Sequence, residues 1–138
     1  MNHITKDEND DLRTPMDEAK YLQIKNAFEK NGGTMGSSDE LDSYLDWRGA
    51  DAATIDEKYI AFRQGSPPTA SEMFEELIHT AQLRNALVST DNVQECELKA
   101  KEKLIKYQKQ YDIPDSEHAQ TVKQVEELKR IISAKNRW

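Results

Sequence analysis

The sequence predicts a mostly helical α+β fold with about five helices and one short β-hairpin. Apolar residues recur at helical spacing through most of the chain, and capping and glycine signals divide these stretches. One stretch near the middle is rich in β-branched and aromatic residues. Because 138 residues is the length of one ordinary domain, we expect a single globular domain over 14–138.

The first helix is expected to follow a flexible acidic arm. Residues 1–13 contain several acidic side chains and few apolar ones, which predicts the arm. Thr14 then suits an N-cap, and Pro15 suits the first helical position because an N–H there would have no partner. The helix is predicted to end at 31–33, where two glycines can adopt the left-handed conformation that follows a helix.

A shorter helix and the β signal come next. The helix is predicted from a cap at Ser38 to a stop at Gly49. In the sequence AATIDEKYIAF, residues 54–55 and 58–62 flank two acidic residues, which predicts a hairpin. The alternation places Tyr59 and Ala61 on one face and Ile60 and Phe62 on the other.

Three longer helices complete the predicted fold. The third predicted helix begins at Thr69, which forms a capping-box pattern with Glu72. The fourth covers about 93–111 and ends before a proline, and the fifth covers about 115–133. Cys96 lies on the apolar face of the fourth helix, so we expect a core side chain in preference to a nucleophile.

The composition disfavours several classes of partner. Hydrophobic residues make up 36% and charged residues 33% of the chain, and the formal net charge is −7. Nucleic acids and anionic membranes attract clustered Lys and Arg, so nucleic acid is an unfavoured partner. No apolar run approaches the roughly 18 residues of a membrane span, and the acidic N-terminus does not resemble a signal peptide. We expect a cytoplasmic protein, or a domain delivered as part of a larger exported protein.

The third helix carries the strongest candidate site, in the sequence EMFEELIHTAQLRN at 72–85. At about 100° per residue, one side of this helix is apolar and His79 points almost directly opposite. Glu75, Glu76 and Gln82 flank His79, and both carboxylates are within one helical turn of it. A carboxylate beside an imidazole can raise its pKa, orient its tautomer or share a metal with it. The alternative is an ordinary amphipathic helix whose polar face lies in water.

The fourth helix offers a second acid. Glu97 projects close to the apolar face of that helix, whereas neighbouring acids point away from it. A carboxylate at the edge of an apolar stripe is costly unless it is paired or binds a ligand. Glu97 is therefore a candidate partner of the third helix, with a solvated helix–helix boundary as the alternative.

The order of strand 58–62, helix 70–87 and helix 93–111 resembles the core of the Glu-zincin metallopeptidases. The segments EELIHTAQ and ECELKAKEKL are similar to the motifs of the compact ImmA/IrrE-like proteases. The resemblance implies that His79 and Glu97 are metal ligands and that Glu76 is the general base for a metal-bound water. Glu75 stands where that family has its first histidine, so the implied divalent metal site has one imidazole and two carboxylates, which suit Mn or Fe.

A second resemblance covers roughly 20–115. The segments FEKNGG, YLDWRGADAATI, FEELIHTAQLRN and CELKAKEKLIKYQKQYDIP are similar to C-terminal effector domains of bacterial polymorphic toxins and phage-associated proteins. This resemblance implies a small delivered domain with a cognate immunity protein.

Three functions remain open from the sequence. One is a toxin-like hydrolase in which Glu76 and His79 are catalytic and Gln82 orients a substrate or ligand. Another is a non-catalytic acidic phage or mobile-element protein that binds and modulates a host protein. The third is a helical scaffold in which an apolar stripe of the last helix is completed by another chain. That stripe comprises Val122, Val125, Leu128 and Ile132.

Overall fold

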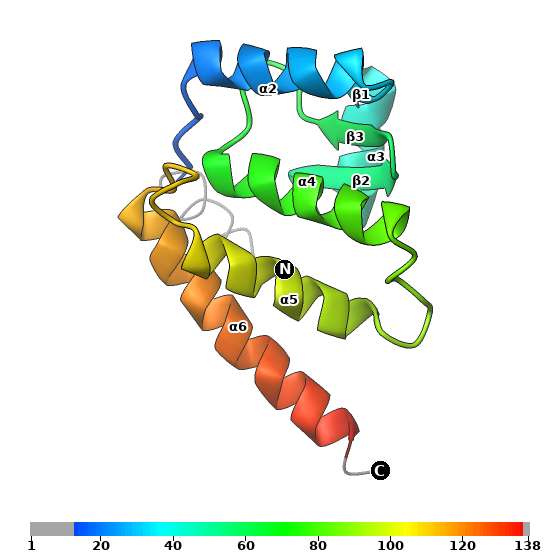
Figure 1. Ribbon diagram of the computed structural model, residues 1–138, viewed down its shortest axis with the longest axis vertical. Coiled ribbons are helices and arrows are strands. Elements are labelled where there is room, and N and C mark those ends of the chain that lie inside the picture. The colour runs from blue at the N-terminus through cyan, green and yellow to red at the C-terminus, as the bar shows by residue number, and fades with distance from the viewer. Residues whose placement is uncertain (1–12, 137–138) are drawn as a thin grey trace.

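A computed structural model describes residues 13–136 and contains, over this range, five helices and three strands (Figure 1). In chain order they are α2 (Glu18–Lys30), β1 (Thr34–Gly36), α3 (Asp39–Arg48), β2 (Ala52–Asp56), β3 (Tyr59–Phe62), α4 (Ala70–Arg84), α5 (Val93–Lys106) and α6 (Asp115–Lys135). The predicted mostly helical α+β class is confirmed.

The strands form a small three-stranded sheet of order β1-β3-β2. Strands β2 and β3 are antiparallel, as predicted for the hairpin, with Ala53 opposite Ala61. The prediction missed β1, which pairs in parallel with β3 and places Met35 opposite Ile60. A three-residue strand carries almost no periodic signal of its own, so its formation depends on the neighbouring strand.

Helices cover both faces of this sheet. Ile60 and Phe62 pack on one face, in an apolar cluster with Met35 and Met73 that residues of α2 extend. On the other face α3 contacts β3 and buries Leu45 completely. The predicted alternation of β3 therefore agrees with the packing.

Beyond the sheet, α4, α5 and α6 lie in successive layers, and the end of α6 projects furthest from the sheet (Figure 1). A second apolar cluster joins α4 to α5 and contains Ile78, Ala100 and Leu104. Val125 and Leu128, half of the apolar stripe predicted for the last helix, are buried, and α6 packs along α5. Helix α4 thus lies between two apolar clusters, which fix the position of the candidate site residues that it carries.

The helix ends follow the capping signals with one exception. Ser38 accepts the backbone N–H of Leu41 at 3.1 Å, and Gly49 ends α3 with a φ of 67°. Thr69 and Glu72 form the predicted capping box of α4. The predicted start of the first helix was wrong, because Asp17 caps α2 and Pro15 lies in a β-bridge with Thr69.

The connection from α5 to α6 is longer than predicted, because the helix expected to reach about 111 ends earlier. Helix α5 ends at Lys106, and 107–112 form turns that close with a φ of 54° at Asp112. This geometry lets the ring of Tyr111 stack on Phe74 of α4, with ring centroids 4.1 Å apart. The buried side chain of Ile113 then enters the α4–α5 cluster.

Most of the predicted acidic arm, 1–13, lies outside the described residues. Arg13 is described, and its guanidinium pairs with Glu72 on α4. None of the helices formed by 13–136 combines the length and apolar character that crossing a membrane requires.

Candidate functional site

Two adjoining cavities lie along one side of α4. The first, called here the polar cleft, has a volume of about 350 Å³ and is bounded by 49–52, the start of α4 and the facing sides of α5 and α6. The second has a volume of about 420 Å³ and is bounded by β2, α4 and the start of α5. Glu75 and Glu76 line both cavities, so the candidate residues of α4 lie where the two spaces meet.

The side of α4 that carries His79 was expected to face water in the ordinary interpretation of the helix, and this is not what is observed. Glu76 and Gln82 are only 9% and 7% exposed. The side chains of Glu75 and His79 are 20% and 21% exposed. Strand β2 on one side and α5 on the other shield this face, which the pattern of α4 alone could not reveal.

Glu75 links α4 to α5 through a cation. Its Oε2 lies 3.1 Å from Nζ of Lys101 and 3.6 Å from Nε2 of His79. Lys101 also donates to Oε1 of Gln124 on α6, at 3.0 Å. The ammonium therefore ties three helices together at the wall of the polar cleft.

His79 is held in one orientation by Gln82. The amide Nε2 of Gln82 donates to the backbone carbonyl of Cys96 at 2.9 Å, which turns its Oε1 toward His79. Nδ1 of His79 lies 2.9 Å from that oxygen and must carry a proton to donate to it. The predicted role of Gln82, to orient a substrate or ligand, stays a prediction, since its amide oxygen is directed at the imidazole of His79.

Glu76 has a different environment from its neighbour Glu75. Its Oε1 accepts a hydrogen bond from the hydroxyl of Thr54 at 2.9 Å, and the same hydroxyl reaches its backbone carbonyl at 3.1 Å. Thr54 belongs to β2, so this contact fixes the carboxyl group between strand and helix. The ion pair with Lys101 belongs to Glu75, whereas the burial of Glu76 is offset by the hydroxyl of Thr54 and by the charge of His79.

The pKa values of Glu75 and Glu76 are consequently shifted in opposite directions. Burial raises the pKa of Glu76 above its usual value, and the charge of Glu75 adds to this effect. Burial also opposes ionisation of Glu75, but the neighbouring imidazole of His79 and the charge of Lys101 outweigh it and lower its pKa. Burial likewise disfavours the charged imidazole of His79, yet the carboxylate of Glu75 and the hydrogen bond to Gln82 raise its pKa above the usual value. Adjacent groups with opposed shifts are typical of acid–base sites.

The predicted metal ligands are only partly brought together. Glu97 lines the second cavity with His79 and Glu75. Among 13–136, however, no group of three or more His, Cys, Asp or Glu side chains is arranged to hold a metal ion. Glu75 is committed to Lys101, and both nitrogens of His79 face protein acceptors. The metal assignment stays a prediction, and the function proposed below does not depend on it.

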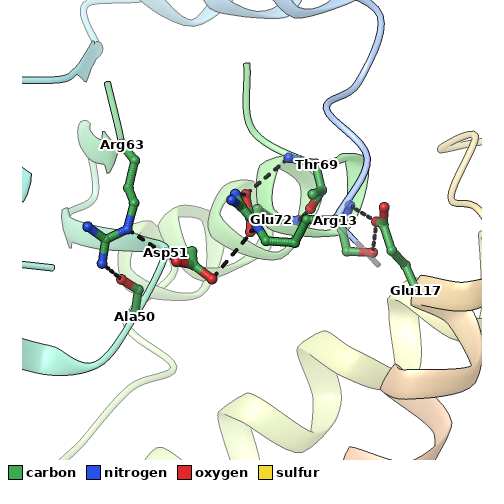
Figure 2. Close-up of polar contacts among 8 residues, drawn as sticks. Arg13, Ala50, Asp51, Arg63, Thr69, Glu72 and Glu117 are labelled. Carbon is green, nitrogen blue, oxygen red and sulfur yellow. Dashed lines mark hydrogen bonds and ion pairs between the residues drawn. The ribbon is translucent and has the colours of Figure 1, made fainter. Parts of the chain in front are cut away.

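A chain of charged residues lies beside the polar cleft (Figure 2), and its members Arg13, Asp51 and Arg63 were not predicted from the sequence. Arg13 donates through Nε and Nη2 to the two oxygens of Glu72, at 2.9 and 2.8 Å. Asp51 lies on its other side, 3.8 Å away, and accepts from Arg63 at 3.2 Å. No sequence signal joins positions so far apart, because such pairs depend on the final packing.

Comparison with family models, with curated proteins and with solved structures finds no match for the chain. The residues and their geometry must therefore carry the functional argument.

Proposed function

We propose that the chain is a toxin-like effector domain with a hydrolytic site at the junction of the two cavities. The observation that carries the proposal is the shared position of Glu76 and a Gln82-oriented His79 on the cavity-lining side of α4. A base needs an orienting hydrogen bond and access to a space that a substrate can enter. Both conditions are met at this junction.

In the proposed reaction Glu76, as carboxylate, takes a proton from water while the oxygen attacks the electrophilic centre of the substrate. The bond to the leaving group breaks, and the leaving group takes the Nε2 proton of the imidazolium of His79, replacing the 3.6 Å contact of that nitrogen with Glu75. Glu75 keeps that imidazole charged and fixed in position. Water is thus divided between the two products, and the proton on Glu76 returns to His79 through solvent.

The test is expression of the full chain in a bacterial host, in the cytoplasm and with an added export signal, combined with hydrolysis assays on peptide, ester, nucleotide and glycoside substrates. We expect growth arrest by the wild type and about a 100-fold or greater loss of hydrolysis in Glu76→Gln. His79→Asn should lose hydrolysis to a similar extent, because it lacks the imidazolium that donates the proton. Its amide can still donate to Gln82, so the fold should be kept.

Glu102→Gln is the matched control, because Glu102 is an exposed acid on α5. All three variants should keep the wild-type circular dichroism spectrum. Full activity in folded Glu76→Gln, or a wild type that neither arrests growth nor hydrolyses any substrate class, would contradict the proposal.

Binding without catalysis is the second candidate function. The observation in its favour is that Glu75, His79, Gln82 and Lys101 all bond within the protein and so can serve as a structural tie between helices. An acidic protein of this kind would bind a basic surface of a host or immunity protein. A stoichiometric partner retained by Glu76→Gln, together with an inert wild type, would favour it.

A further inference from the structure

The polar cleft contains more acids than bases. The carboxyl groups that line it belong to Asp51, Glu72, Glu75, Glu76 and Glu117. The cationic side chains that line it are Arg13 and Lys101. Even so, an excess of acids alone does not identify a ligand, so the contacts of each group matter.

Both cations are bonded to particular acids. Arg13 forms a two-point contact with Glu72, which is the strong geometry for a guanidinium and a carboxylate. Lys101 is held by both oxygens of Glu75, at 3.1 and 3.3 Å. The charges of Glu72 and Glu75 are therefore countered directly, whereas Glu117 receives its hydrogen bonds from Ser71.

Glu117 is the least satisfied of these acids. Its side chain comes from the first turn of α6 and is only 6% exposed. Oε1 accepts from the hydroxyl and the backbone N–H of Ser71, at 2.7 and 3.2 Å (Figure 2). Oε2 is buried and has no hydrogen-bond partner among 13–136. A buried carboxylate oxygen without a donor is costly, and each such atom calls for an explanation.

The single unsatisfied oxygen limits the chemistry of a ligand. A guanidinium prefers to bond both oxygens of a carboxylate, but Ser71 already occupies Oε1. A primary ammonium is a compact donor that one oxygen can satisfy. No group of His, Cys, Asp or Glu among 13–136 is arranged for a metal ion, so an organic cation fits this cleft better.

We propose that the polar cleft binds a primary ammonium group on an alkyl stem, with Oε2 of Glu117 as its acceptor. The ammonium supplies the donor that this oxygen lacks and offsets part of the acid excess of the cleft. The energetic cost of the buried carboxyl group in the free protein is then recovered on binding. Burial raises the pKa of Glu117, and this effect outweighs the hydrogen bonds from Ser71 and the charge of Arg13, which act in the opposite direction.

This chemistry has two sources, a free diamine or polyamine and the side chain of a lysine in a peptide. The polar cleft joins the second cavity through Glu75 and Glu76, so the rest of a bound molecule can extend toward His79. Where the inference thereby names the substrate as an amine-bearing compound, it rests on the proposed function.

The experiment is titration calorimetry on the full chain with 1,5-diaminopentane and with N-acetyl-lysine amide. The neutral analogues 1,5-pentanediol and N-acetyl-norleucine amide test the need for the ammonium. We expect at least one amine to bind with a dissociation constant below about 10 mM, and neither neutral analogue to bind. Binding of the diamine alone identifies a free amine, and binding of the lysine amide identifies a peptide side chain.

Glu117→Gln should weaken binding about tenfold or more, because its amide places a donor or an uncharged oxygen where the ammonium needs a carboxylate. Glu126→Gln, an exposed acid on the same helix, is the matched control and should bind as the wild type does. Circular dichroism checks that both variants are folded. No binding of either amine, or equal affinity in Glu117→Gln, would overturn the inference.

These outcomes separate the inference from the proposed function, since binding is measured without turnover. Hydrolysis that depends on Glu76 in a protein that binds no amine would refute the ammonium site alone. Amine binding that depends on Glu117, in a protein without hydrolysis or growth arrest, would refute the hydrolase alone.

Discussion

Helix α4 is shielded from solvent both where it meets the sheet and where it lines the cavities, but the buried groups differ. On the sheet side Met73 is fully buried in an apolar cluster with Ile60 and Phe62. On the cavity side the shielded groups are Glu76 and Gln82, which need hydrogen bonds to remain there. Burial stabilises the protein on the first side and is costly on the second.

The contrast between the apolar and the polar side of α4 indicates where a functional site is expected. Apolar packing on the sheet side, where Met73 is fully buried, stabilises the position of α4. A buried acid that lowers stability is retained most readily where its chemistry is used. Stability measurements on variants of the two sides of α4 therefore test the functional proposal.

Met73→Ala should have the largest effect on stability. The substitution opens a cavity among side chains that are fully packed, which typically costs about 2–5 kcal/mol of unfolding free energy. Denaturant unfolding monitored by circular dichroism measures it. Leu22→Ala is the control, because Leu22 is exposed and its loss should change stability by less than about 0.5 kcal/mol. A loss below about 1 kcal/mol for Met73→Ala would mean that the sheet side is not the main anchor.

Glu75→Gln should come next, with a loss of about 1–3 kcal/mol at neutral pH. The reason is that Lys101 keeps its charge in a side chain only 14% exposed but loses its carboxylate partner. Because folding lowers the pKa of Glu75, its contribution is present above the usual carboxyl pKa and is lost as the pH falls through the lower folded value.

His79 sets the upper pH limit of the stabilisation by the ion pair with Glu75, whereas Glu75 sets the lower limit. Folding raises its pKa, so its stabilising charge is fully present below the usual value of 6.5 and is lost as the pH rises through the folded value. Unfolding of wild type and Glu75→Gln across acid, neutral and alkaline pH measures both limits. A difference between the two proteins that does not change with pH would contradict the assigned ion pairs.

Thr54→Val should cost about 1 kcal/mol. The valine has nearly the same shape and suits a strand, but it removes the hydroxyl that donates to Glu76. Thr54→Ser keeps that donor and serves as the control for the hydrogen bond. Greater stability of the valine variant than of the serine variant would show that the hydrogen bond contributes little.

Glu76→Gln should have the smallest effect and the opposite sign, a gain of about 0.5 kcal/mol at neutral pH. The amide remains neutral, and its oxygen can still accept from Thr54. Because folding raises the pKa of Glu76, the native state holds its proton more tightly, and wild-type stability falls as the pH rises from the usual carboxyl value through the raised one. The gain should therefore disappear in acid.

Loss of hydrolysis together with a gain in stability would be the clearest sign that Glu76 serves function. Unfolding at acid and neutral pH, measured beside the hydrolysis assay, tests both parts. A Glu76→Gln protein that is less stable than the wild type at neutral pH would instead identify the carboxylate as structural.

Much of the fold could be predicted because its signals are local. The caps at Ser38 and Thr69 bond within three residues, so the sequence specifies where α3 and α4 begin. The start of α2 was misplaced because Pro15 is used in a bridge to Thr69, a contact that no local pattern encodes. The same limit explains why β1 was missed, since its partner β3 lies more than twenty residues later.

The candidate residues Glu75, Glu76, His79 and Gln82 were found from the sequence because helical spacing places them on one side of α4. Only the tertiary structure decided that this side is shielded, that Lys101 neutralises Glu75, and that Thr54 is the hydrogen-bond donor to Glu76. The physical reason is distance along the chain. Spacing on one helix fixes which side chains are neighbours, whereas burial and charge pairing depend on which other elements pack against that helix, and those contacts determine acidity.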